Sequence, residues 1–421
     1  MFFTATFPYG IGEAWKRADV LLLSQHFKHI CIQPLEGSPD DLKDGSWIPD
    51  NVVVQEPLFA SSGLRLTWHG VFRGLKLSPW RVLRESLVAW RRGGRRAVVD
   101  VLVVAEKTVN VLQHPAVRKL LKSGNKRVLF YFYWGLGIAT AIPFVDRGIA
   151  ARSLVRFHGF DLYADRRQGH TPFQADLVER IAVAAPCSEF GMNYLKRLYP
   201  KLAATGRLCC IRVGTTTHGI SPCSRDGVLR IVSSAFMNPV KRVWLLAEAL
   251  RLVRCRVRWE HIGDGPDWER INELAHLMPV NVEAILLGRL TPEDAHRHLA
   301  KNSFDLFVNT SESEGVPVSI MESLSAGIPV LATDVGGTSE IVDDQVGRLV
   351  SKDVTAEQLA RAIDEFAQLT SDQRQRIRKH AYSRFSERCE QSAIGRVLVT
   401  TLSQLDKTVH RTVSPVETFG R

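Results

Sequence analysis

Residues 304–341 constrain the fold of this chain more than any other segment, because they encode two short apolar runs separated by a helix. The first run is Phe304–Val308, and a polar loop leads from it to a helix expected to begin at or near Pro317. The second run is Ile328–Ala332, and the glycine pair Gly336-Gly337 follows it. Two buried strands joined by a helix form a parallel βαβ unit. The polar loop then lies at the carboxyl edge of a sheet, where parallel sheets bind ligands.

The same alternation of apolar runs and helical segments continues through most of the 421 residues. A chain of this length exceeds what one hydrophobic core supports, so we expect two α/β domains with parallel sheets covered on both faces. The predicted domains are residues 1–220 and 221–386, followed by a C-terminal helix and tail over 387–421. The strands expected in the first domain are Phe2–Phe7, Ile30–Gln33, Val99–Val104, Val128–Tyr133, Leu154–Phe157 and Leu208–Val213.

Two glutamates flank the start of the helix in the 304–341 segment. Glu314 lies in the loop before the helix and Glu322 lies within it, with seven residues between them. Ionised carboxylates only accept hydrogen bonds, so the pair suits a ligand rich in hydroxyl groups, such as a sugar or a ribose. The free N–H groups at the helix N-terminus suit a phosphate. The alternative is a solvated helix face, which the apolar neighbours of Glu322 disfavour.

The block around these glutamates resembles the signature of the retaining nucleotide-sugar glycosyltransferases of family 4. The matching elements are E-x7-E, S-E-G-V-P, A-G-I-P-V and V-G-G. The resemblance implies the GT-B fold, in which two Rossmann-like doubly wound parallel-sheet domains face a central cleft and a C-terminal helix crosses back. It implies that Glu322 holds the donor's ribose hydroxyls and that Glu314, as a catalytic residue, holds the sugar hydroxyls. The donor-binding residues implied beside them are Gly315, Val316, Pro317 and Val318.

Lys241 lies where the strand that begins at Leu229 gives way to a helix. An ammonium group at such a junction points into the ligand crevice, where it would act in catalysis by neutralising a departing diphosphate. Members of the resembling family usually carry an arginine five or six residues earlier, whereas this chain has Ala235 and Phe236 there. Arg242 would supply the second, donor-binding charge, unless none is needed. The alternative for Lys241 is a solvated residue at a helix N-terminus, which the helix dipole disfavours.

Two glycine-containing turns follow other strands of the second domain. Gly263 and Gly265 come after the expected strand Arg258–Ile262, and Leu290 ends a G-R-L turn. Glycine permits close approach of the backbone to a ligand, but it also forms plain turns. By the resemblance, the first turn lies near the donor's nucleoside and the second contacts its base. A plain turn explains either one equally well.

The first domain offers two candidate segments. Gly10 and Gly12 lie between a strand and a helix, which suits a donor phosphate or the acceptor. Trp15 stands where a G-x-G-x-x-G fingerprint requires glycine, so a Rossmann oxidoreductase is disfavoured. His158 and Asp161 belong to an H-G-x-D element at the end of a strand. By the resemblance, His158 faces the transferred sugar as a catalytic residue and Asp161 lies near the acceptor; a structural histidine is the alternative.

Positive charge gathers in residues 61–130, which hold 15 Lys and Arg against 3 Asp and Glu, while the whole chain carries +11. A predicted helix there presents on one face four apolar residues spaced by three, four and three: Trp80, Leu83, Leu87 and Trp90. A basic helix with tryptophans is typical of a membrane-surface element, so residues 80–96 would bind anionic lipid. Packing of this face on its own domain is the alternative. No recognition motif supports nucleic acid as a partner.

Val128–Val145 carries no charge over 18 residues, which is close to the length of a membrane span. Its glycines and Pro143 favour a buried strand that runs into a loop and a helix. The first ten residues lack the basic and long apolar regions of a signal peptide. The seven cysteines are scattered and contain no C-x-x-C pair, which indicates neither a disulfide framework nor a zinc site. We therefore expect a cytoplasmic protein, with peripheral attachment to the inner face of the cytoplasmic membrane.

These features predict a retaining hexosyltransferase that moves sugar from a nucleoside diphosphate to an acceptor hydroxyl. A lipid-linked saccharide in polysaccharide or cell-envelope synthesis is the preferred acceptor, because of the basic region. No D-x-D motif lies near the predicted site, so neither a metal nor a cofactor is expected. Two alternatives remain open: a GT-B enzyme of other chemistry, such as a phosphorylase or an epimerase, and a non-catalytic basic protein that binds polyanions.

Overall fold

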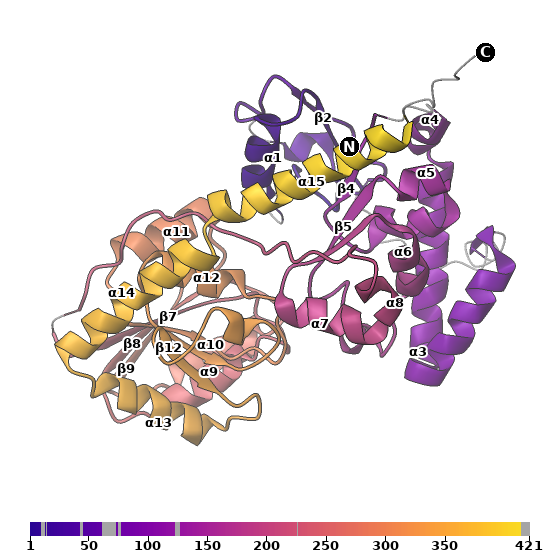
Figure 1. Ribbon diagram of the computed structural model, residues 1–421. Coiled ribbons are helices and arrows are strands. Elements are labelled where there is room, and N and C mark those ends of the chain that lie inside the picture. The colour runs from indigo at the N-terminus through magenta and orange to yellow at the C-terminus, as the bar shows by residue number, and fades with distance from the viewer. Residues whose placement is uncertain are drawn as a thin grey trace, which may run out of the picture. The chain divides into compact units, whose positions relative to one another are not determined.

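The computed structural model describes residues 1–9, 13, 15–42, 45–60, 73–74, 77–122, 127–224 and 226–413. The chain divides into two compact units, whose helices and strands are labelled in Figure 1. The first unit comprises Met1–Cys187, Gly191–Ile211 and the residues from Gly395 on. The second comprises Ser188–Phe190 and Arg212–Ile394.

The first unit is built on a six-stranded parallel sheet in the order β3-β2-β1-β4-β5-β6. The chain leaves β1 toward one edge of the sheet and returns at β4 to build the other. Such a reversal is a topological switch point, where doubly wound sheets bind their ligands. The strands are β1 (Phe2–Thr4), β2 (Ile30–Pro34), β3 (Val52–Val54), β4 (Phe130–Phe132), β5 (Ser153–Phe157) and β6 (Val183–Pro186).

Helices cover both faces of this sheet (Figure 1). One face packs on α1 (Lys16–Ser24) and on α15 (Gln391–Val413), which begins in the second unit and belongs to the first from Gly395 on. Val20 and Leu402 are buried there beside Phe2. The elements of the other face are the end of α3 (Pro79–Gln113), α4 (Pro115–Lys122), η2 (Gly137–Phe144), α5 (Arg147–Ala150), α6 (Gln174–Arg180), α7 (Glu189–Leu198) and α8 (Pro200–Ala203).

The second unit repeats this topology, with a parallel sheet in the order β12-β11-β10-β7-β8-β9 and a switch point between β7 and β10. Its strands are β7 (Leu229–Ser234), β8 (Val257–Ile262), β9 (Val282–Leu286), β10 (Leu306–Asn309), β11 (Val330–Thr333) and β12 (Gly347–Val350). One face packs on α9 (Val243–Leu250), α10 (Trp268–His276) and α13 (Ala356–Ala367). The other packs on α11 (Pro292–Lys301), α12 (Val318–Ser325) and α14 (Ser371–Arg388). The predicted pair of doubly wound parallel sheets is confirmed.

One expected strand is wrong, because Val99–Val104 lies inside α3. The run is rich in valine, which favours a strand, but its buried residues recur at helical spacing: Ala97, Val101, Val104 and Ala105. The edge of the sheet is formed instead by β3, which the sequence analysis did not predict. Leu208–Val213 is extended but is not one of the sheet's strands; Cys209 and Ile211 donate to carbonyl oxygens at the β6 edge.

The predicted apolar face of α3 is exposed to solvent. The alternative, that this face packs on its own domain, is therefore wrong. Trp80 is 82% exposed, and Leu83, Leu87 and Trp90 are exposed with it. The face that packs on the unit is formed by Val82, Glu85 and Ala89.

The uncharged segment Val128–Val145 forms the buried strand β4 and the short helix η2, as expected. Among the described residues, none of the helices combines the length and the apolar character that crossing a membrane requires.

A pair of substitutions separates the helix from the expected strand. Val101 is fully buried, whereas Val99 is 47% exposed, although both would point to the same face of a strand. We expect Val101→Asp to lower the free energy of unfolding of the first unit by at least about 3 kcal/mol, because it buries a charge. Val99→Asp should change it by less than about 0.5 kcal/mol. Urea denaturation followed by circular dichroism measures both, and equal losses would contradict the helix.

Candidate functional site

A lysine and a glutamate meet at the switch point of the second unit. Lys241 follows β7 and Glu314 follows β10, and the two strands are neighbours in the sheet. Lys241 Nζ donates to Glu314 Oε1 at 2.6 Å. The Lys241 side chain is 27% exposed and that of Glu314 is nearly buried, so solvent reaches the pair from the lysine side. The structure therefore brings these two predicted catalytic residues together.

Glu314 is held by three donors on the same oxygen atom. Besides Lys241, Ser311 Oγ donates to Oε1 at 2.6 Å and Asn309 Nδ2 lies at 3.5 Å. Burial works to raise the pKa of the Glu314 carboxyl, but Lys241 and these hydrogen bonds outweigh it and hold the pKa below its ordinary value. The group is thus an ionised acceptor at neutral pH. No donor in the part of the chain that the structure describes contacts Oε2, so that atom can accept from a ligand.

Hydrogen bonds tie the loop after β7 to the loop after β10. The Thr310 hydroxyl donates to the carbonyl oxygens of Lys241 and Arg242, at 3.1 and 2.9 Å. In return, Arg242 Nε donates to the Thr310 carbonyl at 2.8 Å and Nη2 to the Lys352 carbonyl at 2.9 Å. The structure therefore places the Arg242 guanidinium against backbone oxygens, beside Lys241 in sequence but bonded to different groups.

The glycine pair after β11 supports the loop that carries Glu314. Gly337 N donates to the Gly315 carbonyl at 2.7 Å. Gly336 has φ +57°, and a Cβ atom there would lie 1.9 Å from the Glu314 carbonyl oxygen. Only glycine permits this approach of two backbones. Val316 is buried beneath the same turn, and Pro317 is the N-cap residue of α12, which begins at Val318.

The predicted turn at Gly263 and Gly265 packs against the loop after β7. A Cβ atom at Gly263 would lie 2.0 Å from the Ala235 carbonyl oxygen, and one at Gly265 would lie 2.4 Å from that of Met237. These glycines therefore have a packing reason that involves no ligand. Leu290 is partly buried against the apolar cluster under α12.

Glu322 lies on α12 and pairs with a histidine that the sequence analysis did not predict. His296 Nε2, on α11, is 3.1 Å from Glu322 Oε1. The two residues are far apart in the sequence, and no motif joins them, so only the packing of α11 beside α12 reveals the contact.

In the first unit, His158 and Asp161 lie together at the end of β5. Asp161 accepts a hydrogen bond from His158 N on Oδ1 and one from Gly135 N on Oδ2, both at 2.6 Å. The imidazole packs beside the rings of Tyr133 and Trp134, with centroids 4.7 and 4.5 Å away. Burial lowers the pKa of His158 although Asp161 works the other way, so the ring is neutral at pH 7. The predicted Gly10 and Gly12 lie outside the described residues.

A buried ion pair beside His158 was also missed. Glu13 accepts hydrogen bonds from the N–H groups of Thr6 and Phe7 at 2.7 and 2.8 Å and from Trp134 Nε1 at 2.6 Å. The Lys16 ammonium donates to the same carboxylate. Thr6 follows β1 and Trp134 follows β4, so this cluster joins the loops after the two strands at the switch point of the first unit. The position of Glu13, directly after the G-I-G segment, was the signal available in the sequence.

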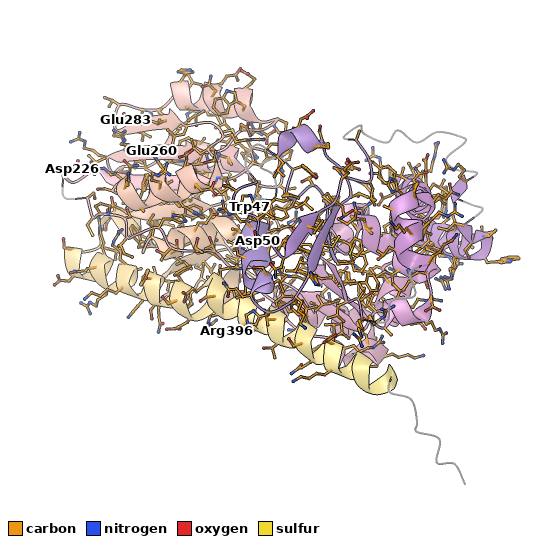
Figure 2. All side chains as sticks on the ribbon, turned by 90° about the horizontal axis from the view of Figure 1, so that it is seen from above. Trp47, Asp50, Asp226, Glu260, Glu283 and Arg396 are labelled. Atoms are coloured by element: carbon orange, nitrogen blue, oxygen red, sulfur yellow. The ribbon has the colours of Figure 1, made fainter. Side chains whose placement is uncertain are left out.

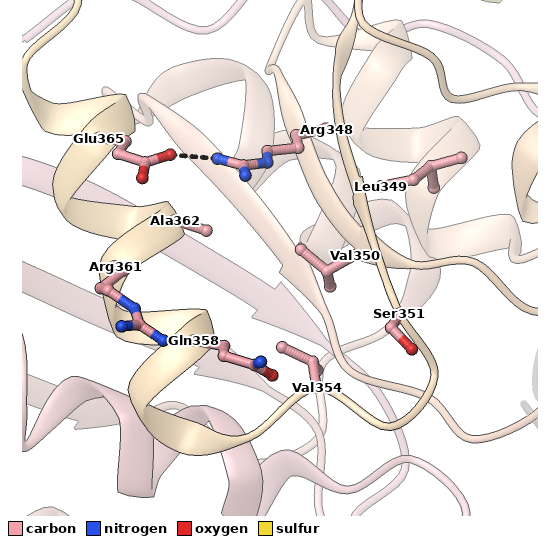
Figure 3. A pocket seen from close by; sticks show the side chains of 9 residues that line it. All are labelled: Arg348, Leu349, Val350, Ser351, Val354, Gln358, Arg361, Ala362 and Glu365. Carbon is pink, nitrogen blue, oxygen red and sulfur yellow. Dashed lines mark hydrogen bonds and ion pairs between the residues drawn. The ribbon is translucent and has the colours of Figure 1, made fainter.

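A shallow hollow lies elsewhere on the second unit, between β12 and α13 (Figure 3). Arg348 and Glu365 pair across it. The hollow lies at the edge strand, two strands away from β10, and contains none of the predicted residues. Within the described ranges, no cluster of three or more His, Cys, Asp or Glu side chains is arranged to hold a metal ion.

Residues 224–384 match the family model of the group 1 glycosyl transferases. This stretch contains both switch-point loops, with Lys241, Glu314 and Glu322. The second unit is a group 1 glycosyl transferase domain.

Two bacterial proteins with putative assignments are similar to this chain in sequence. The chain is 25% identical over 292 residues to the putative colanic acid biosynthesis glycosyltransferase WcaL of Escherichia coli, covering 66% of this chain and 70% of the relative. It is 30% identical over 126 residues to the putative teichuronic acid biosynthesis glycosyltransferase TuaC of Bacillus subtilis, covering 30% of each chain.

Solved structures match nearly the whole chain. Anabaena HepE in complex with UDP superposes with a TM-score of 0.63 at 15% identity, over 96% of this chain and 99% of that one. Sucrose-phosphate synthase from Thermosynechococcus elongatus gives 0.67 at 14% identity, over 98% of each. The likeness shows the fold, which is GT-B as the sequence implied.

The glycine contact behind Glu314 can be tested against a matched glycine. Gly227 has φ +76° but open space around its Cβ position, so Gly227→Ala should cost only the strain of the left-handed backbone, about 1–2 kcal/mol. Gly336→Ala adds a clash with the Glu314 carbonyl oxygen, and we expect it to cost at least about 1 kcal/mol more. Thermal denaturation of both variants measures the difference. Equal destabilisation would show that the approach seen at Gly336 is not tight.

Proposed function

We propose that this chain transfers a hexose-type sugar from a nucleoside diphosphate sugar to an acceptor hydroxyl, with retention of configuration. The contact between Lys241 and Glu314 at the switch point of a group 1 glycosyl transferase domain carries the proposal. It sets one partly exposed cation and one ionised acceptor where a doubly wound sheet binds its ligand. Neither group alone would define a sugar site, but the pair suits a ligand with both a phosphate and hydroxyls.

Each residue has a role in this scheme. Lys241 and the N–H groups at the start of α12 stabilise the charge of the departing diphosphate. Glu314 accepts from sugar hydroxyls through Oε2, and the amides of the Gly315–Val318 turn contribute to donor binding. Glu322 accepts from the ribose hydroxyls. Arg242, bonded to two carbonyl groups, holds the loop that positions Lys241.

The reaction needs no enzyme nucleophile. The bond between the sugar's anomeric carbon and the diphosphate oxygen breaks, and the acceptor oxygen attacks from the same face. The acceptor's proton passes to an oxygen of the leaving phosphate. Lys241 supplies positive charge without a metal, so we propose a metal-independent enzyme.

His158 and Asp161 have roles toward the sugar and the acceptor. A neutral imidazole can both donate and accept a hydrogen bond, which suits a sugar hydroxyl. Neither ring nitrogen of His158 has a hydrogen-bond partner within the described part of the chain. Asp161 fixes the turn beneath the ring through the backbone of His158 and Gly135.

The acceptor in this proposal is a saccharide of the cell envelope, held on a lipid. The names of WcaL and TuaC, which refer to colanic acid and teichuronic acid biosynthesis, support a polysaccharide pathway. The part of α3 before its kink at Gly94 supports a membrane-borne acceptor, because it exposes apolar side chains together with Arg91 and Arg92. Arg95 and Arg96 are exposed just beyond the kink. Exposed tryptophans flanked by arginines fit the interface of an anionic membrane on its cytoplasmic side.

A thermal-shift screen tests the donor site. We expect one of UDP, GDP, ADP and CDP to raise the melting temperature of the wild type, because a ligand that binds only the folded chain stabilises it by mass action. At 100 times the dissociation constant the gain is about 2.7 kcal/mol, and Glu322→Ala should lose most of it. A shift that persists in Glu322→Ala would place the nucleotide elsewhere. No shift with any nucleotide would favour a basic protein that binds polyanions.

Vesicle binding tests the membrane surface on α3. Replacing Arg91, Arg92, Arg95 and Arg96 with Ser should weaken binding to vesicles with anionic lipid, because each basic residue near the surface contributes about 1 kcal/mol. Sedimentation with phosphatidylglycerol vesicles measures the change.

The matched control removes four exposed basic residues from the second unit, namely Arg251, Arg361, Arg376 and Lys379, also by replacement with Ser. Both variants change the net charge equally. Equal weakening in the two variants would mean that net charge alone drives binding, and unchanged binding in the α3 variant would exclude this surface.

A further inference from the structure

His296 makes close contact with Glu322, the residue to which the proposed function gives the ribose hydroxyls. His296 Nε2 is 3.1 Å from Glu322 Oε1, and the two side chains are only 12% and 18% exposed. The histidine lies on α11 and the glutamate on α12, two helices packed on the same face of the second sheet. The same nitrogen is 3.4 Å from Thr215 Oγ1. The imidazole nitrogen therefore lies beside the carboxylate of the neighbouring helix, and the hydrogen bond that it makes is to Thr215.

A segment of the chain packs over this histidine. The ring of His218 stacks on that of His296, with centroids 4.6 Å apart and an angle of 28° between the planes. The Thr217 hydroxyl donates to the Ser325 carbonyl at the end of α12, at 3.0 Å. This segment is thus bonded to the helix that carries Glu322 and stacked on the ring that contacts it. Residues 217 and 218 therefore contact both the ring of His296 and the helix that carries Glu322.

We infer that His296 is a positioning residue for the ribose of the donor. Its Nε2, 3.1 Å from Oε1, keeps the Glu322 carboxylate in place, while Oε2, which no donor within the described residues contacts, accepts from the ribose hydroxyls. A carboxylate that is already held loses less side-chain freedom when the nucleotide binds. His296 itself does not touch the ligand. This inference rests on the proposed function. It adds the residue that orients Glu322, the carboxylate that accepts hydrogen bonds from the ribose.

The same helix provides a matched histidine. His298, two residues along α11, pairs with Glu260 of β8 at 2.7 Å. Arg258 bridges Glu260 and Glu283 on the β8–β9 side of the unit, where Figure 2 labels both carboxylates. A substitution at His298 therefore removes a histidine–glutamate pair from α11 without touching Glu322. It controls for any general loosening of the helix.

The test compares a nucleotide with its 2′,3′-dideoxy form. The probe is UDP, or whichever of GDP, ADP and CDP shifts the wild type in the thermal screen, and titration calorimetry gives the dissociation constants. We expect His296→Ala to weaken the nucleotide about tenfold and its dideoxy form less than about twofold, because only the former presents hydroxyls to Glu322. His298→Ala should leave both constants within about twofold. His296→Gln, which keeps a donor, should restore most of the affinity.

The outcomes separate this inference from the function on which it rests. Equal weakening of both ligands in His296→Ala would make the histidine merely structural and overturn the inference. So would unchanged binding in His296→Ala while Glu322→Gln loses the nucleotide, and in that case the donor site stands. A wild type that binds none of the four nucleotides overturns the donor site and this inference with it.

Discussion

The ion pair between Lys241 and Glu314 is the interaction on which the arrangement of the second unit's ligand edge depends. Burying a carboxylate costs several kcal/mol unless charges and hydrogen bonds compensate it. Here Lys241, Ser311 and Asn309 compensate it, and all three lie on the loops after β7 and β10 or at their roots. The pair can form only because these two strands are neighbours whose carboxyl ends meet. Thr310 and the turn at Gly336 then fix the same loops from two further sides.

The first unit also has a glutamate–lysine pair at its switch point, but there the lysine is buried. Its sheet has the same order, and a glutamate and a lysine again occupy the switch point, here Glu13 and Lys16 between the ends of β1 and β4. Lys16 is fully buried, and burial lowers its pKa well below the ordinary value. The Lys16 pair therefore acts as a clamp that orders the backbone after β1 and the ring of Trp134 beneath His158. Lys241 stays partly exposed, and a ligand can reach it.

How far the sequence predicted this structure depends on the range of each interaction. Lys241, Glu314 and Glu322 follow strand ends inside βαβ units, so their placement comes from local order and from the rule that parallel strands end together. His296 was missed because its contact with Glu322 depends on how α11 packs beside α12, which no local pattern encodes. Val99–Val104 was assigned to a strand because β-branched residues favour one, whereas the buried spacing around Val101 is helical. The exposed face of α3 could not be foreseen either, because amphipathic periodicity gives a shared face without saying what covers it.

The missing arginine changes how a diphosphate would be held in the proposed function. The loop that carries Ala235 and Phe236 is packed against the turn at Gly263, where a Cβ atom would meet the Ala235 carbonyl oxygen at 2.0 Å. Arg242 is occupied by backbone oxygens, and the charge of Lys241 is partly balanced by Glu314. A departing diphosphate therefore meets less free positive charge than a lysine–arginine pair would offer. The N–H groups at the start of α12 must contribute the rest, since a helix N-terminus favours an anion without a charged side chain. In the proposed function, donor affinity then depends more on the hydroxyl contacts of the two glutamates. Each has one carboxylate oxygen beside protein side chains and one that no donor in the described part of the chain contacts.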